Sequence, residues 1–158
     1  MKVLVIGSGG REHAICWALN KSKKVDKIYC SPGNAGTDKI AINAKIDVSN
    51  FRNLEKFIKK ERIDLVIVGP EKPLVNGIVD FLEKKKIKVF GPNKYSSQLE
   101  GSKTFTKKIC DKYNIPTAKF KIIKNKDNLS KILEIFSLPI VVKADGLAAG
   151  KGVYICYH

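Results

Sequence analysis

Short apolar runs alternate with helical patterns through the first hundred residues, and this alternation limits the possible folds more than any other feature of the sequence. The clearest strands are Lys2–Ile6 and Asp64–Val68, which are nearly continuous apolar runs. Further strands are expected at Lys27–Cys30, Ile40–Ile46 and Ile87–Phe90, and helices at Arg11–Asn20, Asp47–Lys60 and Pro73–Lys86. Strand–helix–strand repetition with short loops predicts an α/β fold, with a parallel sheet that carries helices on both faces.

The pattern changes near Gln98, so we place residues 1–100 in a Rossmann-like domain and residues 101–158 in a second domain. In the second domain we expect helices at Leu99–Tyr113 and Asp127–Phe136, the latter capped by Asp127, and strands at Ala118–Ile123, Pro139–Lys143 and Val153–Cys156. The last two strands flank a glycine-rich loop and predict a hairpin. Little chain follows to cover that hairpin, so we expect this domain to be only the start of a larger one.

The sequence has 30 lysine and arginine residues against 15 acidic ones, a formal net charge of +15. A charge of this size suggests nucleic-acid binding. However, the excess is spread along the chain and is nearly all lysine, with arginine only at Arg11, Arg52 and Arg62. We therefore favour a solvated lysine surface that suits anionic substrates, and a polyanion-binding patch is the alternative.

The four cysteines lie far apart, without the spacing of a zinc site or a redox motif, so we expect reduced thiols and no metal ligands. No apolar stretch approaches the roughly 20 residues of a membrane span. The first residues enter a strand pattern and lack the architecture of a signal peptide. We expect a cytoplasmic protein without a membrane or a specific nucleic-acid partner.

The segment Gly7-Ser-Gly-Gly-Arg-Glu-His13 follows a strand and opens a helix. Free amides at a helix N-terminus bind anions, and glycine lets a phosphate approach the backbone. Glu12 replaces the third glycine of a dinucleotide fingerprint, and no acid ends the second strand, so NAD is disfavoured. A phosphorylated small molecule beside Arg11 fits better, and a tight turn without a ligand is the alternative.

A second polar segment, Gly69-Pro-Glu-Lys-Pro-Leu74, follows the strand Asp64–Val68. In parallel sheets the carboxyl ends of the strands form the ligand crevice. Glu71 could accept hydrogen bonds there from ribose hydroxyls or an amine. Alternatively, Glu71 only favours the dipole of a helix that begins at proline.

The third segment is the glycine-rich loop 145–152, with Lys103 and Lys143 on separate elements beside it. Two lysines and a loop of small residues suit a polyphosphate that cations bridge and backbone amides cover. The loop joins two strands and lacks the Walker A pattern, and a flexible hairpin is the alternative. His13 and His158 have no spaced partners, so neither is assigned a catalytic role.

Five segments together resemble the N-terminal part of the phosphoribosylamine–glycine ligase family, also called glycinamide ribonucleotide synthetases, of the ATP-grasp superfamily. They are Gly7–His13, Pro32–Thr37, Val68–Val75, Leu99–Lys107 and Val142–Val153. The resemblance implies a Rossmann-like (pre-ATP-grasp) domain followed by the truncated start of an ATP-grasp domain. It also implies the joining of glycine to 5-phosphoribosylamine, with ATP consumed and glycyl phosphate as the intermediate, in purine biosynthesis.

The resemblance assigns roles to two groups of residues. Those that would hold phosphoribosylamine are Gly9, Gly10, Arg11, Glu12 and Glu71. Those that would contact ATP are Lys103, Lys143, Ala148, Ala149, Gly150, Lys151, Gly152 and Val153.

The sequence departs from this family in length, because its members continue for about two-thirds of their chain beyond the matching part. The resemblance places the ligands of the Mg²⁺ that accompanies ATP, and the glycine site, in that further part. We therefore expect no complete catalytic set and no ligase turnover from the 158-residue chain alone, and a separate C-terminal part is a possible partner. The alternatives are a non-catalytic phosphosugar- or nucleotide-binding fragment and another ATP-grasp carboxylate–amine ligase.

Overall fold

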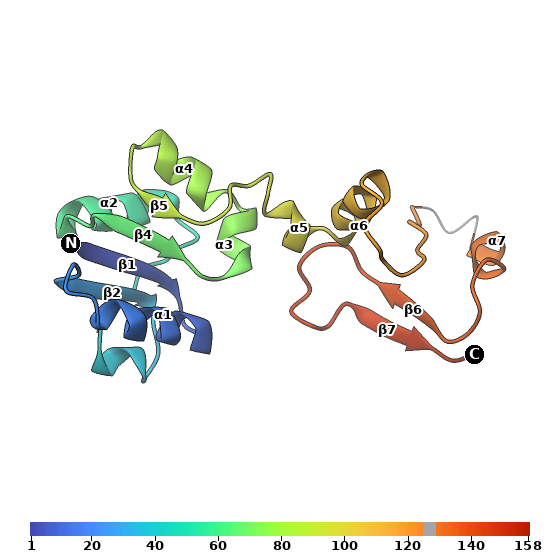
Figure 1. Ribbon diagram of the computed structural model, residues 1–158, viewed down its shortest axis with the longest axis horizontal. Coiled ribbons are helices and arrows are strands. Elements are labelled where there is room, and N and C mark those ends of the chain that lie inside the picture. Colours follow the sequence, from blue (N-terminus) through green and yellow to red (C-terminus); the bar gives the residue numbers. More distant parts are fainter. Residues whose placement is uncertain (125–128) are drawn as a thin grey trace. The chain divides into compact units, whose positions relative to one another are not determined.

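A parallel β-sheet with helices on both faces forms the N-terminal part of the computed structural model (Figure 1). The structure describes residues 1–124 and 129–158, and the chain divides into two units, residues 1–97 and 98–158. The sheet has the order β3-β2-β1-β4-β5, and each neighbouring pair is parallel. Its strands are β1 (Lys2–Gly7), β2 (Lys27–Pro32), β3 (Ile42–Asn43), β4 (Leu65–Val68) and β5 (Val89–Phe90).

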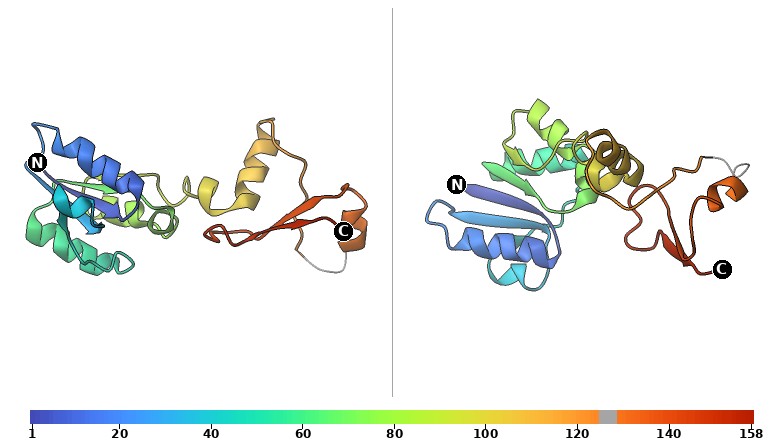
Figure 2. Two further views of the ribbon diagram at one scale, coloured as in Figure 1. Left: turned by 90° about the horizontal axis from the view of Figure 1, so that it is seen from below. Right: turned by 45° about the vertical axis from the view of Figure 1, so that its right-hand side comes forward.

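Helices cover the two faces of this sheet (Figures 1 and 2). The helices of the first unit are α1 (Gly10–Asn20), α2 (Phe51–Glu61), α3 (Glu71–Val75) and α4 (Ile78–Lys84), with a 3₁₀ turn η1 (Thr37–Lys39). Helix α1 lies on one face, and α2 and α4 lie on the other. The predicted α/β fold class is confirmed.

The alternation of side chains along β1 separates two apolar cores. Val3 and Val5 pack towards α1 with the buried Cys16, whereas Leu4 and Ile6 pack with residues of α2 and α4 such as Leu54. Successive residues of a strand point to opposite faces, so a continuous apolar run is expected for a strand that is covered on both. All four cysteines are free thiols, as predicted.

The register of the sheet brings the predicted site loops to one edge. Ile6 pairs with Val68, and Gly7 pairs with Pro32, so the carboxyl ends of β4, β1 and β2 lie next to one another. The loops that follow these strands begin at Gly69, Ser8 and Gly33. The segments that carry Arg11 and Glu71 are therefore neighbours, although they lie far apart in the sequence.

Two helices that the sequence pattern predicts as continuous are interrupted. The helix expected at Pro73–Lys86 consists of α3 and α4, separated at Gly77, whose φ of +88° belongs to the left-handed region. The helix expected at Leu99–Tyr113 consists of α5 (Gln98–Gly101) and α6 (Lys103–Lys112). Ser102 separates them because its side chain caps α6 by accepting a hydrogen bond from the Phe105 N–H.

The second unit contains an antiparallel hairpin of β6 (Ile140–Lys143) and β7 (Val153–Cys156), as predicted. Among the described residues of this unit, a further helix is α7 (Leu129–Leu133); the predicted cap of that helix, Asp127, lies outside them. The strand expected at Ala118–Ile123 is wrong, because that segment pairs with no strand in the described ranges. The strand expected at Ile40–Ile46 shortens to β3. Among the helices described, none is long and apolar enough to cross a membrane.

The break at Gly77 can be tested by the sign of the change in the free energy of unfolding when this glycine is replaced by alanine. Gly77→Ala should lower the free energy of unfolding by about 1 kcal/mol, because alanine is strained in a left-handed conformation. If the helix were continuous, the same change would raise that free energy by about 1 kcal/mol. The measurement is urea unfolding followed by the fluorescence of the single tryptophan, Trp17, with the exposed Asn76→Ala as a control that should change little.

Candidate functional site

The turn between β1 and α1 presents backbone amides at the carboxyl edge of the sheet. Helix α1 begins at Gly10, with Gly9 as its extended N-cap, so the N–H groups of its first turn have no acceptor within the helix. The Gly9 N–H is already used, because it donates to Oε2 of Glu12 over 2.7 Å. The Glu12 N–H interacts with its own carboxylate, so the amides of Gly10 and Arg11 are the ones that this turn offers to an anion.

Arg11 connects the turn with the loop that follows β4. Its Nε donates to Oε1 of Glu12 over 2.8 Å, and its Nη2 lies 4.0 Å from Oε2 of Glu71. The side chains of Arg11 and Glu71 are 59% and 49% exposed, so both can meet a ligand from solvent. The structure thus brings together Arg11, Glu12 and Glu71, which the sequence analysis predicts as one binding group.

Glu12 differs from its two neighbours because it is buried, with only 3% of the residue exposed. Burial opposes its ionisation, but the hydrogen bond and charge of Arg11, together with the Gly9 N–H, outweigh this and hold the pKa of Glu12 below its ordinary value. Its carboxylate is thus ionised at neutral pH, and both of its oxygens accept hydrogen bonds from groups of the protein. A direct role of Glu12 in substrate binding stays a prediction.

The loop Pro32–Thr37, to which the sequence analysis assigns no binding residue, lies against the same turn. The Asn34 side-chain amide donates to the backbone oxygen of Ser8 over 2.8 Å, while its Oδ1 accepts from the N–H groups of Gly36 and Thr37. Asparagine that bonds to the backbone two residues on is typical of a tight turn. Asn34 thus holds this loop against the turn between β1 and α1, and the spacing Asn34-x-Gly36 is the sequence signal that could have identified it.

In the second unit, the N-terminus of α6 is joined to the start of the glycine-rich loop. The carboxylate of Asp145 accepts from the Ser102 hydroxyl and the Thr104 N–H, each over 3.2 Å, and from the Gly146 N–H over 3.0 Å. Burial raises the pKa of Asp145, but these donors together lower it below its ordinary value. Lys103 Nζ donates to the Gly146 oxygen over 2.8 Å, so Lys103 reaches the loop, as predicted from the sequence.

The loop closes beyond the last pair of the hairpin, where Lys143 faces Val153. The Ala144 N–H donates to the Gly152 oxygen over 2.8 Å, whereas Ala149, Gly150 and Lys151 are exposed. The lysines and the loop therefore lie within one unit. Contacts of Lys143 and of residues 148–153 with a nucleotide stay predictions.

Within residues 1–124 and 129–158, no group of three or more histidine, cysteine or acidic side chains could hold a metal ion.

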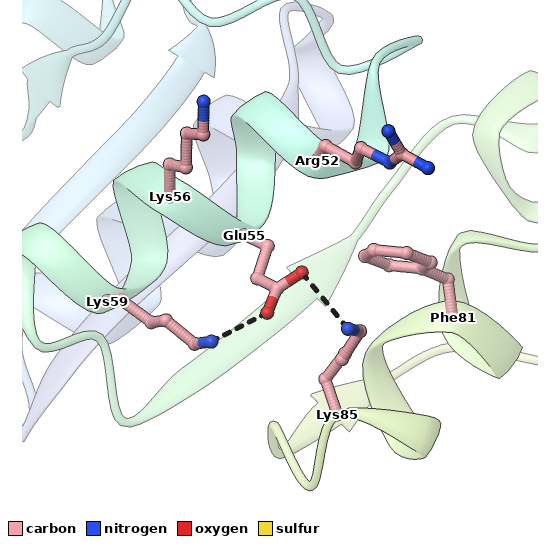
Figure 3. Close-up of a pocket in the computed structure, with 6 residues that line it drawn as sticks. All are labelled: Arg52, Glu55, Lys56, Lys59, Phe81 and Lys85. Atoms are coloured by element: carbon pink, nitrogen blue, oxygen red, sulfur yellow. Dashed lines mark hydrogen bonds and ion pairs between the residues drawn. The ribbon is translucent and has the colours of Figure 1, made fainter.

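The hollow between α2 and α4 has a volume of about 440 Å³. Figure 3 shows the residues that line it, which are Arg52, Glu55, Lys56, Lys59, Phe81 and Lys85. Glu55 forms ion pairs with Lys59 at 2.7 Å and Lys85 at 3.6 Å. The hollow shares no residue with the predicted site, and its central carboxylate already pairs with two of its cations.

A Rossmann-like sheet with an amide turn at its carboxyl edge, followed by a helix and a hairpin with a glycine-rich loop, defines the beginning of an ATP-grasp enzyme. Residues 1–100 match the family described as "Phosphoribosylglycinamide synthetase, N domain", and residues 101–158 match its "ATP-grasp (A) domain". The chain belongs to the phosphoribosylglycinamide synthetase family.

Several similar proteins are named phosphoribosylamine–glycine ligase. The chain is 49% identical to the phosphoribosylamine–glycine ligase of Clostridium acetobutylicum, over 99% of this chain and 38% of the relative. It is 51% identical to that of Caldanaerobacter subterraneus subsp. tengcongensis, over 98% and 37%. The crystal structure of the Thermotoga maritima phosphoribosylamine–glycine ligase superposes on this chain with a TM-score of 0.78 and is 37% identical in sequence. The match covers 100% of this chain and 36% of the Thermotoga chain. The chain therefore spans little more than a third of these relatives.

The anchoring of the loop by Asp145 can be tested by hydrogen exchange. Asp145→Asn removes the charge that strengthens the bonds from the Thr104 and Gly146 amides, so exchange of both amides should become about tenfold faster, or about 1.4 kcal/mol in local stability. Asp111→Asn, which changes an exposed carboxylate of α6, is the control. Equal exchange in all three proteins would contradict the anchoring role.

Proposed function

We propose that this chain provides the phosphoribosylamine site and part of the ATP site of an enzyme that joins glycine to 5-phosphoribosylamine. The glycine carboxylate would take the γ-phosphoryl group of ATP, giving ADP and glycyl phosphate. The amine of phosphoribosylamine would then attack the acyl carbon and expel phosphate, with loss of a proton, to give glycinamide ribonucleotide. Membership of the family and the names of the similar ligases support this reaction.

The first unit would bind the phosphosugar. The observation that carries this assignment is the exposed Arg11 guanidinium beside the first-turn amides of α1, opposite Glu71. The Gly9–Gly10 turn and Arg11 would hold the phosphate, because a guanidinium and helix amides both favour an anion. Glu71 would accept hydrogen bonds from the ribose hydroxyls or orient the amine.

The second unit would bind the phosphates of ATP. Lys143 and Lys103 would neutralise charge on the transferring phosphoryl group, and residues 148–153 would cover it. A cover of this kind also excludes water, which would otherwise hydrolyse the acyl phosphate. The anchor formed by Asp145 and Lys103 supports this role, because it holds the base of the loop while the tip is exposed. We assign glycine and the metal to no residue of this chain, and we place the reaction in the cytoplasm.

The phosphosugar site is tested by the binding of ribose 5-phosphate to the 158-residue chain, measured by titration calorimetry. Arg11→Ala should weaken binding at least about tenfold, as expected when a charged hydrogen bond to phosphate is lost. Arg52→Ala, an exposed arginine in the hollow of α2, should leave it unchanged. Strong affinity for DNA that falls steeply with salt and does not respond to Arg11→Ala would instead support the polyanion alternative.

The whole reaction can be tested with a chimera of the Clostridium acetobutylicum ligase in which this chain replaces the segment that it matches. The chimera should release ADP only when both glycine and phosphoribosylamine are present. Lys143→Ala in the chimera should lower kcat/KM for ATP by about tenfold or more, because a phosphate contact is lost, while Lys131→Ala, on α7, serves as the control. A chimera that folds and binds ATP but uses another amine acceptor would show that the family assignment does not give the substrate.

A further inference from the structure

The buried carboxylate of Glu12 has two partners, Arg11 and the Gly9 N–H, and both lie in the turn that forms the proposed phosphate site. Oε2 accepts from the Gly9 N–H over 2.7 Å, and Oε1 accepts from Nε of Arg11 over 2.8 Å. Since the residue is 3% exposed, a ligand in solvent has little access to these oxygens. Glu12 therefore contacts the arginine that would bind phosphate and the turn whose next amides would face it, while its own side chain is buried in the protein.

Two glycines at the carboxyl ends of adjacent strands make room for this side chain. A Cβ built at Gly69, after β4, would overlap Oε1 of Glu12, and one built at Gly7, the last residue of β1, would overlap its Cγ. The space that these glycines leave is thus filled by Glu12. Its carboxylate is held at the junction of the two central strands and cannot turn freely towards solvent.

The bond to Nε also directs the guanidinium of Arg11. It uses the donor nearest the chain and leaves the terminal nitrogens available for another acceptor. One of these, Nη2, lies 4.0 Å from the exposed Glu71 carboxylate. An arginine that is fixed in this way loses less conformational freedom when it binds an anion than a mobile one does.

From this geometry we infer that Glu12 is a positioning residue of the phosphate site. It fixes the direction of the Arg11 guanidinium and the form of the Gly9 turn, and it does not touch the phosphosugar. The inference rests on the proposed function for the identity of the ligand. It separates Glu12 from Glu71, which would contact the sugar, although family resemblance places both among the substrate-binding residues.

The two roles give different results with two anions. Glu12→Gln keeps the size of the side chain but removes its charge, so binding of ribose 5-phosphate and of inorganic phosphate should weaken by the same factor, about tenfold. In an Arg11→Ala background the change should have a smaller further effect, because the part of its action that passes through Arg11 is already lost and only the part that passes through the Gly9 turn remains. Weaker binding of ribose 5-phosphate with unchanged binding of inorganic phosphate would mean that Glu12 contacts the sugar, and would overturn the inference.

A second measurement on the unmodified chain needs neither ligand nor variant. The NMR signals of the Gly9 amide and the Arg11 Nε–H should shift together as Glu12 is protonated, with a midpoint below the ordinary glutamate pKa, and the Arg52 signal should not follow them. The folded-state pKa of Glu12 is lowered, so its stabilising effect is complete above the unfolded-state pKa and is lost as pH falls through the folded-state value.

The two experiments fail separately. If neither anion binds to the unmodified chain but the two signals titrate together, the proposed function is wrong and the positioning by Glu12 stands. If the two signals do not titrate together, the positioning role is wrong, whatever the chain binds. This second result decides the inference even if Glu12→Gln fails to fold.

Discussion

The parallel pairing of β1 with β4 is the constraint on which the proposed site depends. Because Ile6 pairs with Val68, the turn that starts α1 and the turn that starts α3 emerge side by side from the sheet. Arg11 and Glu71 are thereby placed within 4.0 Å of each other, as measured between Nη2 and Oε2. A shift of this register by one residue would also exchange the two faces of β1 between the cores, so the apolar packing and the site geometry are fixed together.

Arg11 lies between a buried carboxylate and an exposed one, and the two interactions differ in strength. The contact with Glu12 is a short hydrogen bond to a group that stays ionised, whereas the contact with Glu71 is a longer ion pair between exposed side chains. Exposed ion pairs contribute little to stability. A phosphate bound as we propose would therefore replace Glu71 at the guanidinium at low cost, while the hydrogen bond to Glu12 would keep the arginine in place.

Much of the first unit could be predicted from the sequence, because a strand that is buried on both faces reads as an apolar run and needs no knowledge of its partners. The break at Gly77 could not, since a left-handed residue inside an apolar periodic pattern leaves that pattern intact. The segment Ala118–Ile123 alternates like a strand, but alternation does not supply a neighbour to pair with. In the site, residue types and spacing predicted Arg11 and Glu71, while the burial of Glu12 and the bonds from Asp145 to the start of α6 depend on contacts that spacing does not encode.

The packing of Glu12 against Gly69 makes the two positions a single steric unit that joins the first turn of α1 to the loop after β4. Only the volume occupied by the longer residue forbids a side chain at position 69, since Gly69 has no positive φ. Mutational scanning of one site at a time would score each as intolerant, whereas libraries that vary both would recover pairs in which a smaller residue at 12 permits alanine at 69. Such pairs should restore folding but leave the guanidinium of Arg11 without its internal partner. They would thus distinguish the contribution of Glu12 to folding from its contribution to ligand binding.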